Sequence, residues 1–163
     1  TPSSALPAAG LRYDPAYAHY LAFWLDEAGG TAHVWAGGFR MPSAEAQGSG
    51  QAGAQLSFRA AQFRHTDAGR GFRVLLSQAP GSAALPFGDG RNTGLAPGAW
   101  LTLSAVHPAL RGVLDAFGNG VTGNATIPAS LPPGTQIFYA AVVFDAATPD
   151  FGDLADSAFF STQ

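Results

Sequence analysis

The longest apolar run of the chain occupies residues 135–145, Thr-Gln-Ile-Phe-Tyr-Ala-Ala-Val-Val-Phe-Asp. Its even positions include Phe138 and Val142, and its odd positions include Tyr139 and Val143, so both parities are apolar. A strand with one face in water alternates apolar with polar residues. This segment therefore predicts a strand that is covered on both faces, in a large sandwich, against a partner subunit, or both.

Shorter strand patterns precede and follow this run, and Gly, Pro or Asp residues separate them. Residues 18–25 and 31–36 flank an Asp-Glu-Ala-Gly-Gly turn and predict a hairpin, since two Gly residues can supply positive φ. Residues 54–63 alternate apolar with polar positions, and together with residues 72–77 they predict a second hairpin. Other strands are expected at residues 100–106, 125–129 and 157–162, whereas residues 41–53 and 79–99 are expected to be loops.

No segment has a convincing 3.6-residue period over three turns, and 21 Gly and 12 Pro punctuate the chain. Such punctuation is typical of many short strands joined by turns. We therefore expect an all-β fold, an antiparallel β-sandwich of about eight or nine strands that is Ig-like or jelly-roll-like. Residues 1–17 form a Pro-rich N-terminal arm, a candidate strand donor, and residues 18–163 form a single β-sandwich domain.

The composition is unusual for its low charge. Charged residues make up 12% of the chain, against about 25% in ordinary soluble domains, and all eight cations are Arg. Codon usage of a GC-rich genome explains this pattern, and so does a surface packed in an assembly or coated with glycan. The net charge of −3 without a basic cluster argues against a nucleic-acid surface and against electrostatic membrane docking.

Other sequence features bear on location. The chain has no Cys, so it offers neither a disulfide nor a thiolate metal site, and no apolar run is long enough to span a membrane. The opening Thr1-Pro2-Ser3-Ser4 looks like a mature end left after signal-peptide removal, although a trimmed chain would look the same. We expect an extracellular or cell-surface protein on this basis, with Asn124-Ala-Thr126 as a glycosylation sequon.

The second half of the chain carries an ordered series of turn and core residues. The series runs through Leu114-Asp-Ala-Phe-Gly118, Thr126-Ile-Pro128, Pro133-Gly134, and Tyr139 followed by Asp145. This order resembles an uncharacterised β-sandwich module of secreted proteins from planctomycetes and some other environmental bacteria. Ala141 stands where those modules have Gln. The resemblance covers a little over half of the chain and implies a fold, since no catalytic residue carries over.

Candidate metal ligands are few. Asp145, Asp150, Asp153 and Asp156 lie within twelve residues, and Gly152 permits a tight turn among them. Hard oxygen ligands on a loop suit Ca²⁺, but turn-forming Asp residues in a solvated loop are the simpler interpretation. Asp89 with Asn92 is a weaker calcium candidate. His19 and His33 could face each other across the first hairpin and bind a metal, or form a plain cross-strand pair.

No catalytic arrangement is evident. Gly48-Ser-Gly50-Gln-Ala-Gly53 matches a dinucleotide-binding fingerprint by letters, but the fingerprint requires a helix after it, and a strand is expected there. There is no nucleophile elbow, and Glu occurs only at positions 27 and 45. We predict no enzyme activity, no catalytic residue, no resident cofactor and no assigned metal site.

Two functions remain open. The first is a non-catalytic extracellular structural subunit that assembles with copies of itself into a filament or surface layer. Its arm would add to a neighbour's sheet edge, and its candidate interface residues are Leu6, Leu11, Tyr13 and Tyr17. The second is a secreted carbohydrate-binding or adhesion module. It would use aromatic residues such as Trp100, or Trp24 and Trp35 on a shared face, to stack on sugar rings.

Overall fold

The computed structural model describes residues 10–14, 19–26, 31–35, 41–85, 90–145 and 150–163. The chain divides into two compact units, Thr1–Met41 and Pro42–Gln163. The boundary expected after residue 17 instead falls inside the first unit. Each unit is described by itself.

The first unit contains one antiparallel sheet of three strands, in the order β1-β2-β3. The strands are β1 (Gly10–Asp14), β2 (His19–Asp26) and β3 (Thr31–Trp35). The predicted hairpin of β2 and β3 is confirmed, with Leu25 opposite Ala32 and Ala22 opposite Trp35. β1 pairs with β2 of the same chain, with Leu11 opposite Ala22 and Tyr13 opposite Tyr20.

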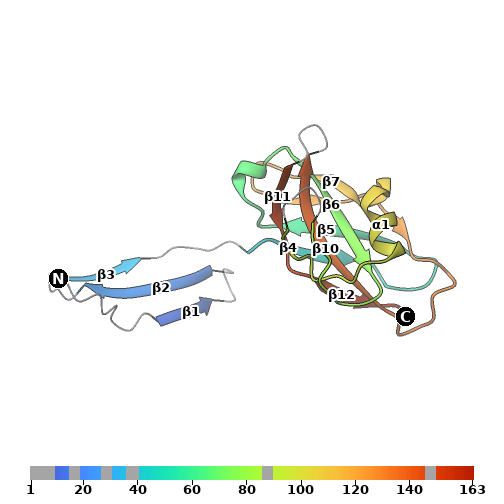
Figure 1. Ribbon diagram of the computed structural model, residues 1–163, viewed down its shortest axis with the longest axis horizontal. Helices are drawn as coiled ribbons and strands as arrows, with labels where there is room; N and C mark the ends of the chain where they lie inside the picture. The colour runs from blue at the N-terminus through green and yellow to red at the C-terminus, as the bar shows by residue number, and fades with distance from the viewer. Residues whose placement is uncertain (1–9, 15–18, 27–30, 36–40, 86–89, 146–149) are drawn as a thin grey trace. The chain divides into compact units, whose positions relative to one another are not determined.

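Within its described residues, the second unit has nine strands in two antiparallel sheets, which confirms the all-β, sandwich-like fold (Figure 1). One sheet has the order β11-β10-β6-β7, and β12 also pairs with β10; the other has the order β4-β5-β8, and β9 also pairs with β5. The strands are β4 (Ser43–Gln47), β5 (Gln55–Ala61), β6 (Gly71–Ser77), β7 (Arg111–Val113), β8 (Gly120–Val121), β9 (Ala125–Thr126), β10 (Gln136–Asp145), β11 (Asp150–Leu154) and β12 (Ala158–Ser161).

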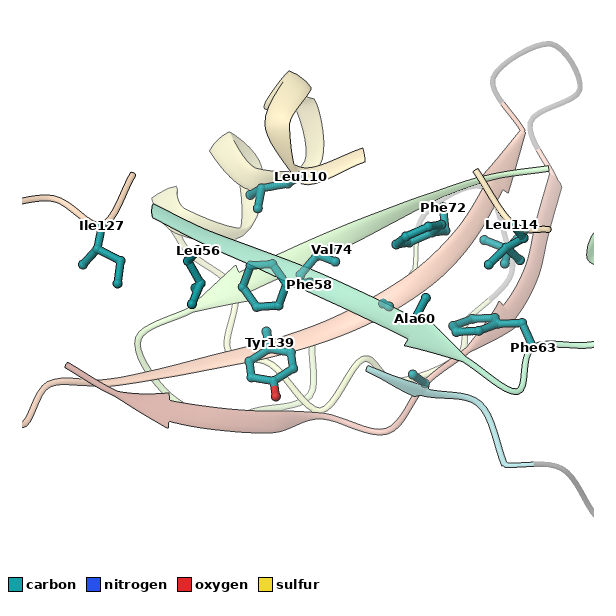
Figure 2. Close-up of a cluster of buried hydrophobic side chains, with 13 residues drawn as sticks. Leu56, Phe58, Ala60, Phe63, Phe72, Val74, Leu110, Leu114, Ile127 and Tyr139 are labelled. Carbon is teal, nitrogen blue, oxygen red and sulfur yellow. The ribbon is translucent and has the colours of Figure 1, made fainter. Parts of the chain in front are cut away.

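The main core of this unit lies between the two sheets. Phe58 of β5 packs against Tyr139 of β10, with ring centroids 5.0 Å apart (Figure 2). Val74 of β6 and Val143 of β10 are fully buried in the same cluster. The Tyr139 hydroxyl accepts a hydrogen bond from the Ala46 backbone N–H at 3.2 Å, so the one polar atom of this ring is satisfied.

A second, smaller core lies on the opposite face of β10. Ala140 and Val142 are buried there together with Leu75, Leu85 and Leu95. The short helix α1 (Ala99–Val106) covers this face. The prediction that residues 135–145 are covered on both faces is therefore confirmed. Because the second cover comes from the same unit, β10 by itself supplies no argument for a partner subunit.

The strand expected at residues 100–106 is wrong, because these residues form α1. Leu101 and Ala105, four residues apart, pack against the second core, whereas Leu103 is 65% exposed and Ser104 is 4% exposed. The Ser104 hydroxyl accepts from the Leu76 N–H at 2.9 Å and donates to the Leu101 carbonyl. An apolar run this short does not separate a helix from a strand by periodicity.

The end of α1 follows from its sequence. Pro108 disfavours the helical conformation at the residue before it, and His107 is extended, with φ −66° and ψ 124°. The His107 side chain accepts a hydrogen bond from the Ala109 N–H and caps the 3₁₀ turn η2 (Pro108–Leu110).

The second predicted hairpin is also wrong. β5 and β6 lie in different sheets, and the connection between them contains the 3₁₀ turn η1 (His65–Asp67). The expected loop at residues 41–53 contains β4, where Ala44 and Ala46 pack against the main core while Glu45 is exposed. Small polar and Ala residues in alternation carry too weak a signal to predict such an edge strand.

The D-x-x-G sequence at Asp115 forms a tight turn. Asp115 Oδ1 accepts hydrogen bonds from the N–H groups of Phe117 at 2.8 Å and Asn119 at 2.9 Å. Gly118 has φ +75°, and a Cβ there would collide with the Phe63 backbone carbonyl. The local sequence thus meets both requirements of the turn, a side-chain acceptor and a residue that tolerates positive φ.

Candidate functional site

The predicted interface residues belong to the first unit. Leu6 and Tyr17 lie outside the described residues, whereas Leu11 and Tyr13 lie on β1. Directly opposed residues of an antiparallel pair share a face. The register therefore places Leu11 and Tyr13 on the same face as Trp24 and Trp35.

The other face of this sheet is also largely apolar. It holds Leu21, Phe23 and Leu25 of β2 and Val34 of β3. Within the described part of the first unit, these strands form a single layer. A stable sheet needs a second layer to bury an apolar face, so each face of this one calls for cover from outside the sheet.

The predicted His pair does not form. β2 pairs His19 with Asp14 of β1, and His33 of β3 lies opposite Trp24. The two His residues are therefore not cross-strand neighbours, because positions 19 and 24 are five residues apart along β2.

Of the predicted calcium ligands, Asp150 and Asp153 form ion pairs with arginines. The Asp153 carboxylate binds the Arg64 side chain and also accepts from the Arg64 backbone N–H at 2.9 Å. Arg70 binds Asp67 at 2.7 Å and Asp150 at 3.2 Å. Among the described residues no cluster of three or more His, Asp or Glu side chains is arranged to hold a metal ion. Calcium binding at residues 145–156 stays a prediction.

This network has a structural role in the second unit. Asp67 is 3% exposed, and its other oxygen accepts from the Asp153 N–H at 2.9 Å. A Cβ at Gly152 would lie 2.5–2.7 Å from the Asp67 carboxylate, so β11 passes this group too closely for any side chain. Asp67 belongs to η1, in the connection that leads from β5 in one sheet to β6 in the other. Its carboxylate thereby ties this connection to β11.

One hollow of the second unit lies between α1 and the outer face of β6 and β10. It has a volume of about 420 Å³ and is lined mostly by apolar side chains, among them Leu75, Leu85, Leu101, Val142, Phe144 and Phe151. We call this hollow the α1 groove. Its volume is within the range of small-molecule sites, about 300–1,000 Å³.

One charged side chain, Arg73 of β6, lines the α1 groove. Arg73 lies opposite Val142 in the ladder, so it shares the outer face of the sheet with Leu75. Its guanidinium donates to the Ala105 carbonyl near the end of α1 and lies 5.2 Å from the centre of the Phe144 ring. Burial lowers the pKa of Arg73 below its ordinary value, and the positive charge of Arg111 lowers it further.

A second hollow of about 230 Å³ lies on the other side of α1. The half-buried Trp100 lines it together with Leu103, His107, Thr126 and Pro128. We call it the Trp100 hollow. It combines one aromatic surface with a few polar groups.

Comparisons with models of known protein families, with curated proteins and with solved structures find no match to this chain. Within the described residues, no helix has the length and apolarity needed to cross a membrane.

Sequence reasoning missed the α1 groove and Arg73. The signal that could have found it is the charge itself, because Arg73 interrupts the otherwise apolar run Phe72-Arg-Val-Leu-Leu76. A cation inside such a run must reach solvent, an anion, or backbone carbonyls.

Proposed function

We propose that this protein is a non-catalytic extracellular structural subunit, which assembles with copies of itself into a filament or surface layer. The observation that carries the proposal is the three-stranded sheet of the first unit. Its central strand β2 carries apolar residues on both faces, and the three strands form a single layer within the described part of that unit.

The physical argument rests on the cost of uncovered apolar surface. Each fully buried large apolar side chain is worth about 1.5–3 kcal/mol relative to an exposed one. One face carries Leu11, Tyr13, Tyr20, Trp24 and Trp35 by register, so covering it from a neighbouring copy supplies enough free energy for association. The low charged fraction of 12% agrees with a surface that is packed against neighbours.

Assembly through β1 would join one surface of a copy to a different surface of the next copy. A strand that donates to a neighbour's sheet, or a face that docks on a different patch of the next copy, makes a heterologous contact, and such contacts build open filaments. Light scattering and negative-stain electron microscopy of the purified chain test this directly.

A double variant, Leu11→Ser with Tyr13→Ser, sharpens the test, and Arg12→Ser is its control. Leu11 and Tyr13 lie on the face that carries Trp24 and Trp35, whereas Arg12 pairs with Leu21 on the other face. We expect the double variant to remain monomeric and Arg12→Ser to assemble normally. Deletion of residues 1–10 should also abolish assembly and leave a folded monomer. A wild-type chain that stays monomeric at all concentrations would refute the proposal.

The second candidate is a secreted carbohydrate-binding or adhesion module, and the Trp100 hollow favours it. An indole beside His107 and Thr126 offers a sugar ring a stacking surface with hydrogen-bonding groups nearby. Glycan-array binding by a monomeric protein, lost in Trp100→Ala and retained in Trp35→Ala, would support this function over assembly.

A further inference from the structure

The α1 groove holds a cation in apolar surroundings. Its walls include Leu75, Leu85 and Leu101, and Arg73 is its charged residue. Among the described side chains no carboxylate forms an ion pair with Arg73; the three ion pairs found there use Arg64 and Arg70.

Helix capping accounts for only part of the hydrogen-bonding capacity of Arg73. Its Nη1 donates to the Ala105 carbonyl, and Arg111 does the same to the Val106 carbonyl at 2.9 Å. Cations at the end of a helix are favourable, and the exposed Arg111 suffices for that role. A guanidinium has five N–H donors, so Arg73 retains donors that can reach a ligand in the groove.

A partly buried cation whose charge has no counterion attracts an anion that can reach it. The fork of a guanidinium matches a carboxylate with two parallel hydrogen bonds. Phe144, whose ring lies 5.2 Å from the Arg73 guanidinium carbon, restricts where this group can lie. The groove thus offers one fixed anion position at the side of an apolar cavity.

We propose that the α1 groove binds an amphipathic monocarboxylate, with its apolar tail on the side chains beneath α1 and its carboxylate on Arg73. The inference does not rest on the assembly proposed above, because the groove lies wholly within the second unit.

The other polar groups of the groove narrow the ligand class. The Thr93 hydroxyl already donates to the Ala83 carbonyl at 2.8 Å, and the Thr102 hydroxyl donates to the Gly98 carbonyl. Few donors are therefore left for a sugar, which needs several. A single guanidinium balances one negative charge, which favours a carboxylate over a phosphate dianion.

Calorimetric titration of the full chain with octanoate tests the proposal, and acetate, octanol and octylamine serve as ligand controls. Methyl NMR locates the site through Leu75, Leu85, Leu101 and Val142. We expect octanoate to bind at one site and to shift these methyl signals, acetate and octylamine not to bind, and octanol to bind more weakly than octanoate.

Two variants isolate the charge. Arg73→Met keeps the length of the side chain and should weaken octanoate binding by about 10- to 100-fold, as expected for a lost charge-assisted hydrogen bond. Arg111→Met removes the neighbouring cation outside the groove lining and should change affinity by less than about 3-fold, because screened charges without contact contribute little.

Titration of the wild-type chain with the four ligands tests the proposal even if Arg73→Met fails to fold. No binding of octanoate, or methyl shifts confined to other parts of the chain, would overturn the inference. Equal affinity for octanol and octanoate would also overturn it, and would leave the groove to an uncharged apolar occupant such as a segment of another chain.

Discussion

Replacing Asp67 by Asn tests whether the buried carboxylate ties the connection between β5 and β6 to β11. Asn has nearly the same shape but no charge. Asp67 accepts from Arg70 at 2.7 Å through one oxygen and from the Asp153 N–H at 2.9 Å through the other. An amide has a single oxygen, so its NH₂ group must point at one of these two donors.

The expected cost follows from burial. Hydrogen bonds to charged groups are worth about 1.5–3 kcal/mol, and removing one partner of a buried ion pair costs about 3–5 kcal/mol. Arg70 keeps its contacts to the Asp150 backbone and side chain, which reduces the loss. We expect Asp67→Asn to lower the free energy of unfolding of the second unit by about 3 kcal/mol.

Asp150→Asn is the matched control, because Asp150 binds the same arginine at 3.2 Å through a side chain that is 67% exposed. Exposed ion pairs contribute about 0–1 kcal/mol. The Asp150 backbone carbonyl also accepts from Arg70 and is unchanged by the substitution. We therefore expect a loss below about 1 kcal/mol.

Urea unfolding of the full chain measures both variants in a Trp24→Phe, Trp35→Phe background. Trp100 is then the only tryptophan, and its fluorescence reports the second unit. If Asp67→Asn and Asp150→Asn lower the free energy of unfolding equally, the buried carboxylate does not tie this connection to β11 and the reasoning fails.

Three further predictions concern the core and turns of the second unit. Burial raises the pKa of Tyr139, and the charge of Glu45 adds to the shift. The folded state thus holds the Tyr139 proton more tightly than the unfolded state, so the free energy of unfolding falls as pH rises above about 10. Tyr139→Phe should flatten that decline in urea titrations at several pH values. Gly118→Ala should lower the free energy of unfolding by more than about 2 kcal/mol in thermal unfolding, because Gly118 has a positive φ and a Cβ there would collide with the Phe63 backbone. Phe58→Ala, at a fully buried position, should lower the free energy of unfolding in urea by about 3–5 kcal/mol. Phe117→Ala, where the side chain is 70% exposed, should lower it by less than about 0.5 kcal/mol.

The sequence predicted those elements whose apolar pattern is long or whose turn chemistry is explicit. β10, with its two-sided apolar pattern, and the antiparallel pairing of β2 with β3 belong to this group. α1 was missed because its eight residues, Ala-Trp-Leu-Thr-Leu-Ser-Ala-Val, suit either a helix or a strand, and packing against β6 decides between them. The pairing of β5 was missed because its connection to β6 looks like a hairpin turn yet crosses between the sheets.

The candidate sites divide in the same way. Leu11 and Tyr13 are predicted from their apolar character in a Pro-rich arm, and the strand register places them on the same face as Trp24 and Trp35. The α1 groove could not be predicted, because its walls come from β6, α1, β10, β11 and the segment between β6 and α1, which sequence patterns alone do not bring together.

The apolar strands of this chain thus lead to two different conclusions. β10 is apolar on both faces, and within one unit a sheet buries one face while α1, Leu85 and Leu95 cover the other. β2 is equally apolar on both faces, but its unit supplies one layer in the described residues. The same pattern is therefore satisfied within one unit for β10, whereas the described residues supply no second layer for β2. Substitutions on β2 should accordingly change assembly before stability, and those on β10 should change stability alone.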